Sequence, residues 1–193
     1  MTGKQHRKTV KHYNEPGDSH FLTFSCYRRL PLLSKDRTRL WTVQAISEAR
    51  VPFAFDLWAW VIMPEHVHLL IWPRNPDYQM KDILSAIKRP VGSKAIAYLE
   101  RHAPSFLKRL TIHNARRTYR RFWQAGPGRD NNLFEPEAIH AAIDYIHQNP
   151  VRRGLVTKAE DWIWSSARDW AGLGAVDLPV DRTVPTLQQT VWR

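Results

Sequence analysis

The sequence predicts an α+β domain with an antiparallel sheet, because of the order in which strand-forming and helix-forming segments follow one another. Aromatic and β-branched residues concentrate in four short segments, a composition typical of strands. Apolar residues recur at helical spacing between and after these segments. The predicted order is βαββαβ followed by one further helix. This is the ferredoxin-like arrangement, in which two helices cover one face of a four-stranded sheet and leave the other face for a site.

Three of the four predicted strands have a clear sequence pattern, and the fourth is ambiguous. Segments 20–27 (HFLTFSCY) and 53–62 (FAFDLWAWVI) are rich in aromatic and branched residues, and 66–72 (HVHLLIW) follows the second of them after only three residues. That short break predicts an antiparallel pair. The pattern further along is ambiguous, and 119–124 (YRRFWQ) is the candidate for the fourth strand. The Gly- and Pro-containing stretch at 126–130 is expected to be a loop.

Three helical regions are predicted. The first is 35–49 and the last is 135–147. The one between them begins after 75–77 and resumes over 91–99. Ser34 is a candidate N-cap for the first helix. Pro90 is expected to kink or end the second, because proline lacks the N–H that the helix needs. The last helix carries an apolar stripe with acidic residues in its first turn, and Pro150 is expected to close it.

The 193 residues are enough for one domain with tails. We expect a basic flexible tail at 1–18, one domain at 19–150, and an extension at 151–193 that packs back on the domain. Cys26 is the only cysteine, which excludes an intramolecular disulfide and a Cys-rich zinc site and is typical of a reducing cytoplasm. The N-terminal residues are polar and basic, and no apolar run approaches the roughly 20 residues of a membrane span. We therefore expect a cytoplasmic protein without a signal peptide or membrane segment.

The charge balance indicates a polyanionic partner. Twenty-nine Lys and Arg stand against eighteen Asp and Glu, a formal net charge of +11. Each cation that neutralises a phosphate releases condensed counterions, so nucleic acid is the favoured partner. The alternative is a generic basic protein that adheres to acidic surfaces.

Two pairs of residues could carry chemistry. His66 and His68 are two apart in a predicted strand, so both imidazoles point to the same face and could begin a metal site. Tyr145 and Asn149 are four apart in a predicted helix and share a face, where a hydroxyl nucleophile and an amide ligand could act together. Taken singly, the first pair could be ordinary surface histidines, and the second a core tyrosine and a helix-end asparagine. Together they compose a phosphodiester cleavage site.

The two motifs resemble those of a known family. The segment 64–70 (PEHVHLL) resembles the HUH motif, and 145–156 (YIHQNPVRRGLV) resembles the tyrosine helix of REP-associated tyrosine transposases, followed by a similar WxWSS stretch at 162–166. The resemblance covers about 18–170, with the motifs in the same order. It implies the HUH endonuclease fold, with the late helix as a catalytic helix. It also implies Tyr145 as nucleophile, His66, His68 and Asn149 as ligands of Mg²⁺ or Mn²⁺, and a 5′-phosphotyrosine intermediate.

The same resemblance implies a single-stranded DNA hairpin as substrate, bound by a monomer or a homodimer. Positive charge is concentrated between and after the motifs, and the candidate DNA-binding residues are Lys88, Arg89, Arg116, Arg117, Arg120, Arg121, Arg152 and Arg153. The two pairs between 116 and 121 are three to four apart and could line one helical face. The aromatic residues at 119, 122 and 123 could stack on unpaired bases. For any single residue, a solvated charge or a packed aromatic ring is the alternative.

Two other functions remain open at this point. One is a non-catalytic single-strand-binding module on the same fold, such as a domesticated transposase; no Gly-Phe-rich signature of RNA-recognition domains supports it. The other is a rolling-circle initiator or relaxase, against which the Tyr-x-x-x-Asn-Pro context and the small size argue.

Overall fold

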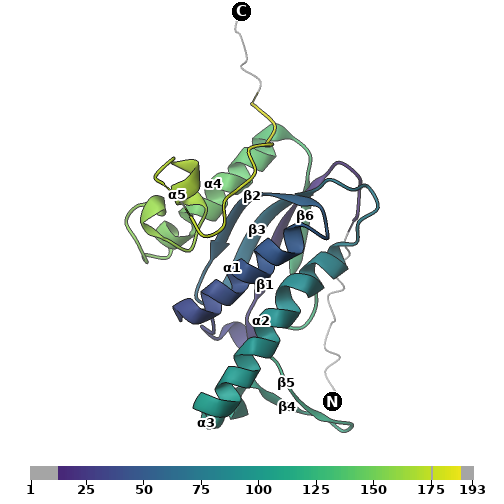
Figure 1. The fold of residues 1–193 in the computed structure, drawn as a ribbon, viewed down its shortest axis with the longest axis vertical. Helices are drawn as coiled ribbons and strands as arrows, with labels where there is room; N and C mark the ends of the chain where they lie inside the picture. Colours follow the sequence, from purple (N-terminus) through teal and green to yellow (C-terminus); the bar gives the residue numbers. More distant parts are fainter. Residues whose placement is uncertain (1–12, 175, 188–193) are drawn as a thin grey trace, which may run out of the picture.

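The computed structural model describes residues 13–174 and 176–187 and is built around a four-stranded antiparallel sheet (Figure 1). The strand order is β2-β3-β1-β6, the order of a ferredoxin-like sheet. The four strands are β1 (Ser19–Ser25), β2 (Phe55–Ile62), β3 (His66–Pro73) and β6 (Arg129–Leu133). The predicted fold class is therefore confirmed. No described helix is both long enough and apolar enough to cross a membrane.

Helices cover both faces of this sheet. The helices are α1 (Asp36–Arg50), α2 (Met80–His102), α3 (Pro104–Leu107), α4 (Pro136–Arg152) and α5 (Ala167–Trp170). Figure 1 shows α1 and α2 side by side across one face, and they contact each other extensively. Helix α4 packs on the opposite face, against β2 and β3. The sheet thus separates two apolar cores, one under α1 and α2 and one under α4.

Alternation along the strands assigns each side chain to one of these cores. Leu22 and Phe24 of β1 face the core under α1 and α2, whereas Phe21 packs against the core under α4. In β3, Val67, Leu69 and Ile71 face α1 and α2, as their spacing predicts. Strand β2 carries a register shift between 57 and 59, a bulge that puts two consecutive residues on the α4 side.

The fourth strand was predicted at the wrong place. Segment 119–124 does not form it: β5 (Thr118–Arg120) pairs only with β4 (Thr111–His113) in a separate hairpin, and β6 takes the edge position beside β1. The sequence of β6, RDNNL, is polar and has low strand propensity, so its pattern did not reveal it. A buried hydrogen bond between two side chains holds it in place. The side chains of Asp130 and His20 are 1% and 0% exposed, and Oδ1 lies 2.8 Å from Nδ1.

Three predicted helix ends also differ from the structure. Helix α2 runs through Pro90 because both halves bury one continuous apolar face against the sheet. Helix α4 includes Pro150 and ends at Arg152, where the N–H of Arg153 bonds the carbonyl of Asn149. Ser34 does not cap α1, because its hydroxyl donates to the carbonyl of Pro31 and the cap position is the residue after it.

Beyond α4 the chain returns along the edge strand β2. The N–H of Ile62 donates to the carbonyl of Trp164, and the N–H of Ser166 donates to that of Trp60. Such pairing covers an edge that would otherwise expose unsatisfied backbone groups. Two indole N–H groups reinforce it, since those of Trp162 and Trp170 donate to carbonyls of β2. Residues 1–12 of the predicted tail, and residues 175 and 188–193 of the predicted extension, lie outside the described residues.

The loop before β6 makes a close backbone contact that can be tested. Gly126 and Gly128 both have positive φ, +90° and +94°, but only at Gly128 would an added Cβ overlap the backbone oxygen of Thr23. Gly126→Ala should cost about 1–2 kcal/mol for the backbone conformation alone. Gly128→Ala should cost a further 1–3 kcal/mol for the overlap. Denaturant unfolding of the two variants measures the difference, and equal losses would contradict the packing described.

Cys26 offers a second test, because it lies fully buried directly after β1. Burial raises the pKa of its thiol to about 12. Native protein at pH 8 should therefore resist iodoacetamide, and unfolded protein should react rapidly, as mass spectrometry of the one labelled residue will show. Since the folded pKa lies above the unfolded one, this thiol's contribution to stability is complete below the ordinary thiol pKa. It is lost as the pH rises from there toward about 12. Native labelling at the unfolded rate would contradict this burial.

Candidate active site

The two histidines of β3 lie together on the α4 face of the sheet. Both are buried, and their Nε2 atoms are 3.0 Å apart. The strand alternation that sends Val67 and Leu69 to the opposite core puts both imidazoles on this side. The two candidate ligands thus converge, as the spacing predicted.

Each imidazole is held from behind through its Nδ1 atom. Glu65 Oε1 lies 3.1 Å from Nδ1 of His66, and Thr23 Oγ1 lies 2.8 Å from Nδ1 of His68. A carboxylate only accepts hydrogen bonds, so Nδ1 of a neutral His66 carries the proton and its Nε2 presents a lone pair. Threonine can accept from His68 in the same way. This arrangement aims both Nε2 atoms at one point, as supporting residues do for metal-bound histidines.

Burial keeps both imidazoles neutral. It lowers the pKa of His68 to about 3, and the neighbouring His66 acts in the same direction. Burial also lowers the pKa of His66, although the Glu65 carboxylate opposes that effect. Neutral imidazole is the form that binds metal ions.

Glu65 itself is tied to the C-terminal end of α4. Its Oε1 accepts a 2.7 Å hydrogen bond from Nη1 of Arg153, and Nη2 of Arg29 lies 3.8 Å away. Burial alone would raise the pKa of Glu65, but the hydrogen bond and charge of Arg153, together with the hydrogen bond to His66, outweigh it and lower that pKa. Sequence reasoning missed Glu65 and Thr23. The position of Glu65, directly before His66 in an apolar stretch, was the one available signal.

The tyrosine of α4 lies beside the histidines and is open to solvent. Tyr145 is 40% exposed, and its ring centre is 5.6 Å from that of His68 and 5.8 Å from that of Phe21. The guanidinium of Arg152, two helical turns later, lies over the Tyr145 ring at 4.9 Å. An aromatic wall and a cation therefore flank the ring, which stays partly open to solvent.

Asn149 completes the group. It is buried, and Nδ2 of its amide lies 3.2 Å from Nε2 of His68. Tyr145 and Asn149 thus both contact His68 from one face of α4, as their four-residue spacing predicted. His147 points elsewhere and bonds Ser166, which anchors α4 to the returning chain.

The donor set fits a hard divalent cation. Two ligands about 2.1 Å from one ion and at a right angle are about 3 Å apart, which matches the separation of the two Nε2 atoms. The Asn149 amide carries an oxygen beside the nitrogen that contacts His68, and amide oxygen suits Mg²⁺ or Mn²⁺. Among residues 13–174 and 176–187, no group of three or more His, Cys, Asp or Glu side chains could hold a metal ion, at this site or elsewhere, so the third ligand of this set is the amide.

The candidate DNA-binding residues fall into two separate groups. Arg152 is the last residue of α4 and Arg153 follows it, where Arg153 pairs with Glu65 beside His66. The others lie on α2 and on or beside the β4–β5 hairpin, on the far side of the sheet: Lys88, Arg89, Arg116, Arg117, Arg120 and Arg121. The expectation that the four arginines line one helical face is wrong, because this segment forms a two-stranded hairpin.

Comparison with known proteins agrees with these motifs. No protein-family model matches the chain. A Haemophilus influenzae protein named as a REP-associated tyrosine transposase is 29% identical, with 73% of this chain and 85% of the relative covered. The REP-associated tyrosine transposase of Escherichia coli K12 is 26% identical, with 84% and 90% covered.

One solved structure has the same fold along nearly the whole chain. It is that of a REP-associated tyrosine transposase bound to a REP hairpin, with a TM-score of 0.66 and 22% identity, covering 95% of this chain and 99% of that one. Motif order, fold and relatives therefore agree: the chain is similar to REP-associated tyrosine transposases in sequence, and shares the fold of one of them.

Proposed function

We propose that this protein is a metal-dependent endonuclease that cleaves and rejoins single-stranded DNA at hairpin sequences through a covalent 5′-phosphotyrosine. One observation carries the proposal. An exposed tyrosine lies in ring contact with one of two buried histidines whose Nε2 atoms converge. The relative whose structure was solved was bound to a REP hairpin, which supports a hairpin substrate here as well.

His66, His68 and Asn149 are the residues that would hold the cation. When bound, Mg²⁺ or Mn²⁺ supplies electrostatic stabilisation of the charge that develops on the phosphate. Glu65 and Thr23 orient the two imidazoles, and burial keeps both of them neutral.

Tyr145 is the proposed nucleophile. Its hydroxyl oxygen forms the bond to phosphorus as the bond from phosphorus to the 3′-oxygen breaks, so the products are a 5′-phosphotyrosine and a free 3′-hydroxyl. Attack by that hydroxyl in the reverse direction rejoins the strand. Arg152, stacked on the Tyr145 ring, lies where it can pair with a phosphate oxygen next to the nucleophile.

Tyr145→Phe tests the nucleophile by removing only its hydroxyl. We expect no covalent adduct and a loss of cleavage of at least about 10³-fold, with hairpin binding changed less than about twofold. Labelled single-stranded hairpin DNA incubated with Mn²⁺ and resolved on a denaturing gel measures the adduct. Tyr13→Phe is the matched control, since Tyr13 is 60% exposed and away from the histidines. Wild-type cleavage by Tyr145→Phe would end the assignment. Metal-indifferent binding without any adduct in the wild type would favour a non-catalytic binding module.

Glu65→Gln tests how His66 is held. The variant keeps an acceptor for Nδ1 but loses the charge that pairs with Arg153, so Mn²⁺ affinity should fall about 10–100-fold. His66→Ala should abolish specific binding. Electron paramagnetic resonance of free Mn²⁺ during a titration measures the Mn²⁺ affinity of each variant independently of activity. Glu48→Gln removes the same charge from the exposed surface of α1 and should bind like the wild type. Unchanged Mn²⁺ affinity in Glu65→Gln would refute the positioning role.

A further inference from the structure

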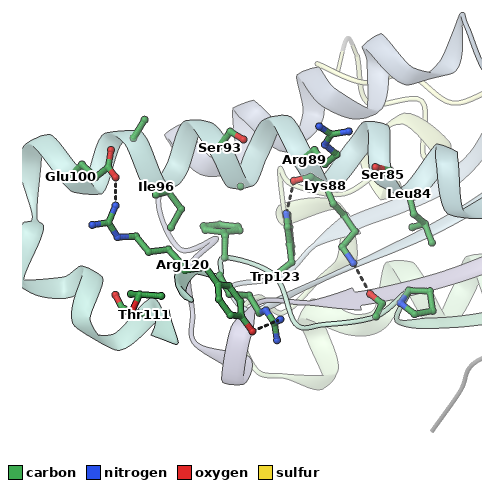
Figure 2. Close-up of a pocket in the computed structure, with 18 of the residues that line it drawn as sticks. Leu84, Ser85, Lys88, Arg89, Ser93, Ile96, Glu100, Thr111, Arg120 and Trp123 are labelled. Atoms are coloured by element: carbon green, nitrogen blue, oxygen red, sulfur yellow. Dashed lines mark hydrogen bonds and ion pairs between the residues drawn. The ribbon is translucent and has the colours of Figure 1, made fainter. Parts of the chain in front are cut away.

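A large groove runs between α2 and the β4–β5 hairpin, on the side of the sheet opposite Tyr145. Figure 2 shows side chains of α2 facing those of the hairpin and of the loop that follows it. Its volume is about 1160 Å³. Clefts for small ligands are mostly about 300–1,000 Å³, so this groove is sized for a segment of an extended molecule.

The groove is strongly positive. Its lining includes five cationic side chains and one anionic one: Lys81, Lys88, Arg89, Arg120, Arg121 and Glu100. The single carboxylate, Glu100, is paired with Arg120 (Figure 2). The remaining four cations have no carboxylate on the groove wall to neutralise them. Charge complementarity therefore favours a polyanion.

Lys88 is the cation set deepest in this wall. Its Nζ donates to the carbonyl of Gly126 at 3.0 Å, and burial lowers the pKa of Lys88 to about 8. An ammonium has three donors, and among the described residues this carbonyl is its one hydrogen-bond acceptor. A phosphate in the groove would supply both a further acceptor and a compensating charge.

The aromatic residues of the groove are not available as stacking platforms. Phe122 and Trp123 are 4% and 7% exposed, and the Trp123 indole donates to the carbonyl of Lys88. The ring of Tyr119 already carries the guanidinium groups of Arg117 and Arg121 at 4.9 and 5.2 Å. The expected stacking of bases on Phe122 and Trp123 is therefore contradicted by their burial. The groove offers cations and hydroxyls, which contact phosphates more than base edges.

We propose that this groove binds the sugar–phosphate backbone of DNA away from the reacting phosphate, and contributes affinity rather than sequence choice. The proposal rests on the proposed function, because it takes the same DNA as substrate. In this proposal the cations of α2 and the hairpin bind the DNA backbone, whereas Arg152 and Arg153 belong to the proposed cleavage site.

The test is DNA binding in the Tyr145→Phe background, where cleavage does not interfere. Lys81→Ala combined with Arg89→Ala removes two exposed groove cations with little risk to folding. We expect affinity for a hairpin with single-stranded flanks to fall on the order of tenfold, and the slope of log affinity against log salt to fall by about two. A hairpin of scrambled sequence should lose affinity by the same factor.

Lys94→Ala combined with Arg37→Ala is the matched control. It removes one Lys and one Arg from α2 and α1 outside the groove, where Lys94 bonds Gln44 and Arg37 stacks on Tyr98. Affinity and salt slope should stay near those of the background protein.

Blunt hairpins and unpaired strands, tested separately, identify which part of the DNA the groove takes. A loss confined to one of them supports the proposal and names the paired or the unpaired backbone.

Three outcomes would overturn the groove assignment: wild-type affinity and salt slope in the groove variant, an equal loss in the control, or a loss that depends on DNA sequence. These readouts are separate from catalysis. Loss of binding in the groove variant together with no adduct from the wild-type protein would contradict the nuclease while leaving the groove in place.

Discussion

The register of β1 against β3 is the constraint on which the site depends. Thr23 lies opposite His68 in that pairing, so the residue that orients one imidazole comes from the neighbouring strand. A slip of one residue in either strand would put Thr23 and the two histidines on opposite faces of the sheet. The close approach of Gly128 to the backbone of Thr23 fixes the same position from the other side.

The second half of the site is joined to the first by an ion pair. Glu65 precedes β3 and Arg153 follows α4, and their contact links the strand that carries the imidazoles to the helix that carries Tyr145. One carboxylate thus orients His66 and holds the C-terminal end of α4. Because its side chain is only 9% exposed, its pairing is screened less than a surface ion pair would be.

Local periodicity explains what could be predicted from the sequence. The His66–His68 spacing and the Tyr145–Asn149 spacing each fix a face of one element, and the structure brings those faces together. Features that depend on distant partners were not predictable. The polar strand β6 forms because Asp130 meets His20, 110 residues away in sequence. Helix α2 continues through Pro90 because packing on both sides of it outweighs the lost hydrogen bond. No pattern in the sequence indicates that Thr23 contacts His68.

The distribution of positive charge also depends on distant contacts. In the sequence, Lys and Arg residues recur throughout 81–153. Folding divides this charge, because the chain crosses from the α2 side to the α4 side through the edge strand β6. Arg153 is committed to Glu65, and Arg120 to Glu100. Of the others, Lys81, Lys88, Arg89 and Arg121 line the groove on one side, and Arg152 lies over Tyr145 on the other. Charge that is uniform along the chain therefore becomes two surfaces, and a DNA strand that touches both must pass around the sheet between them.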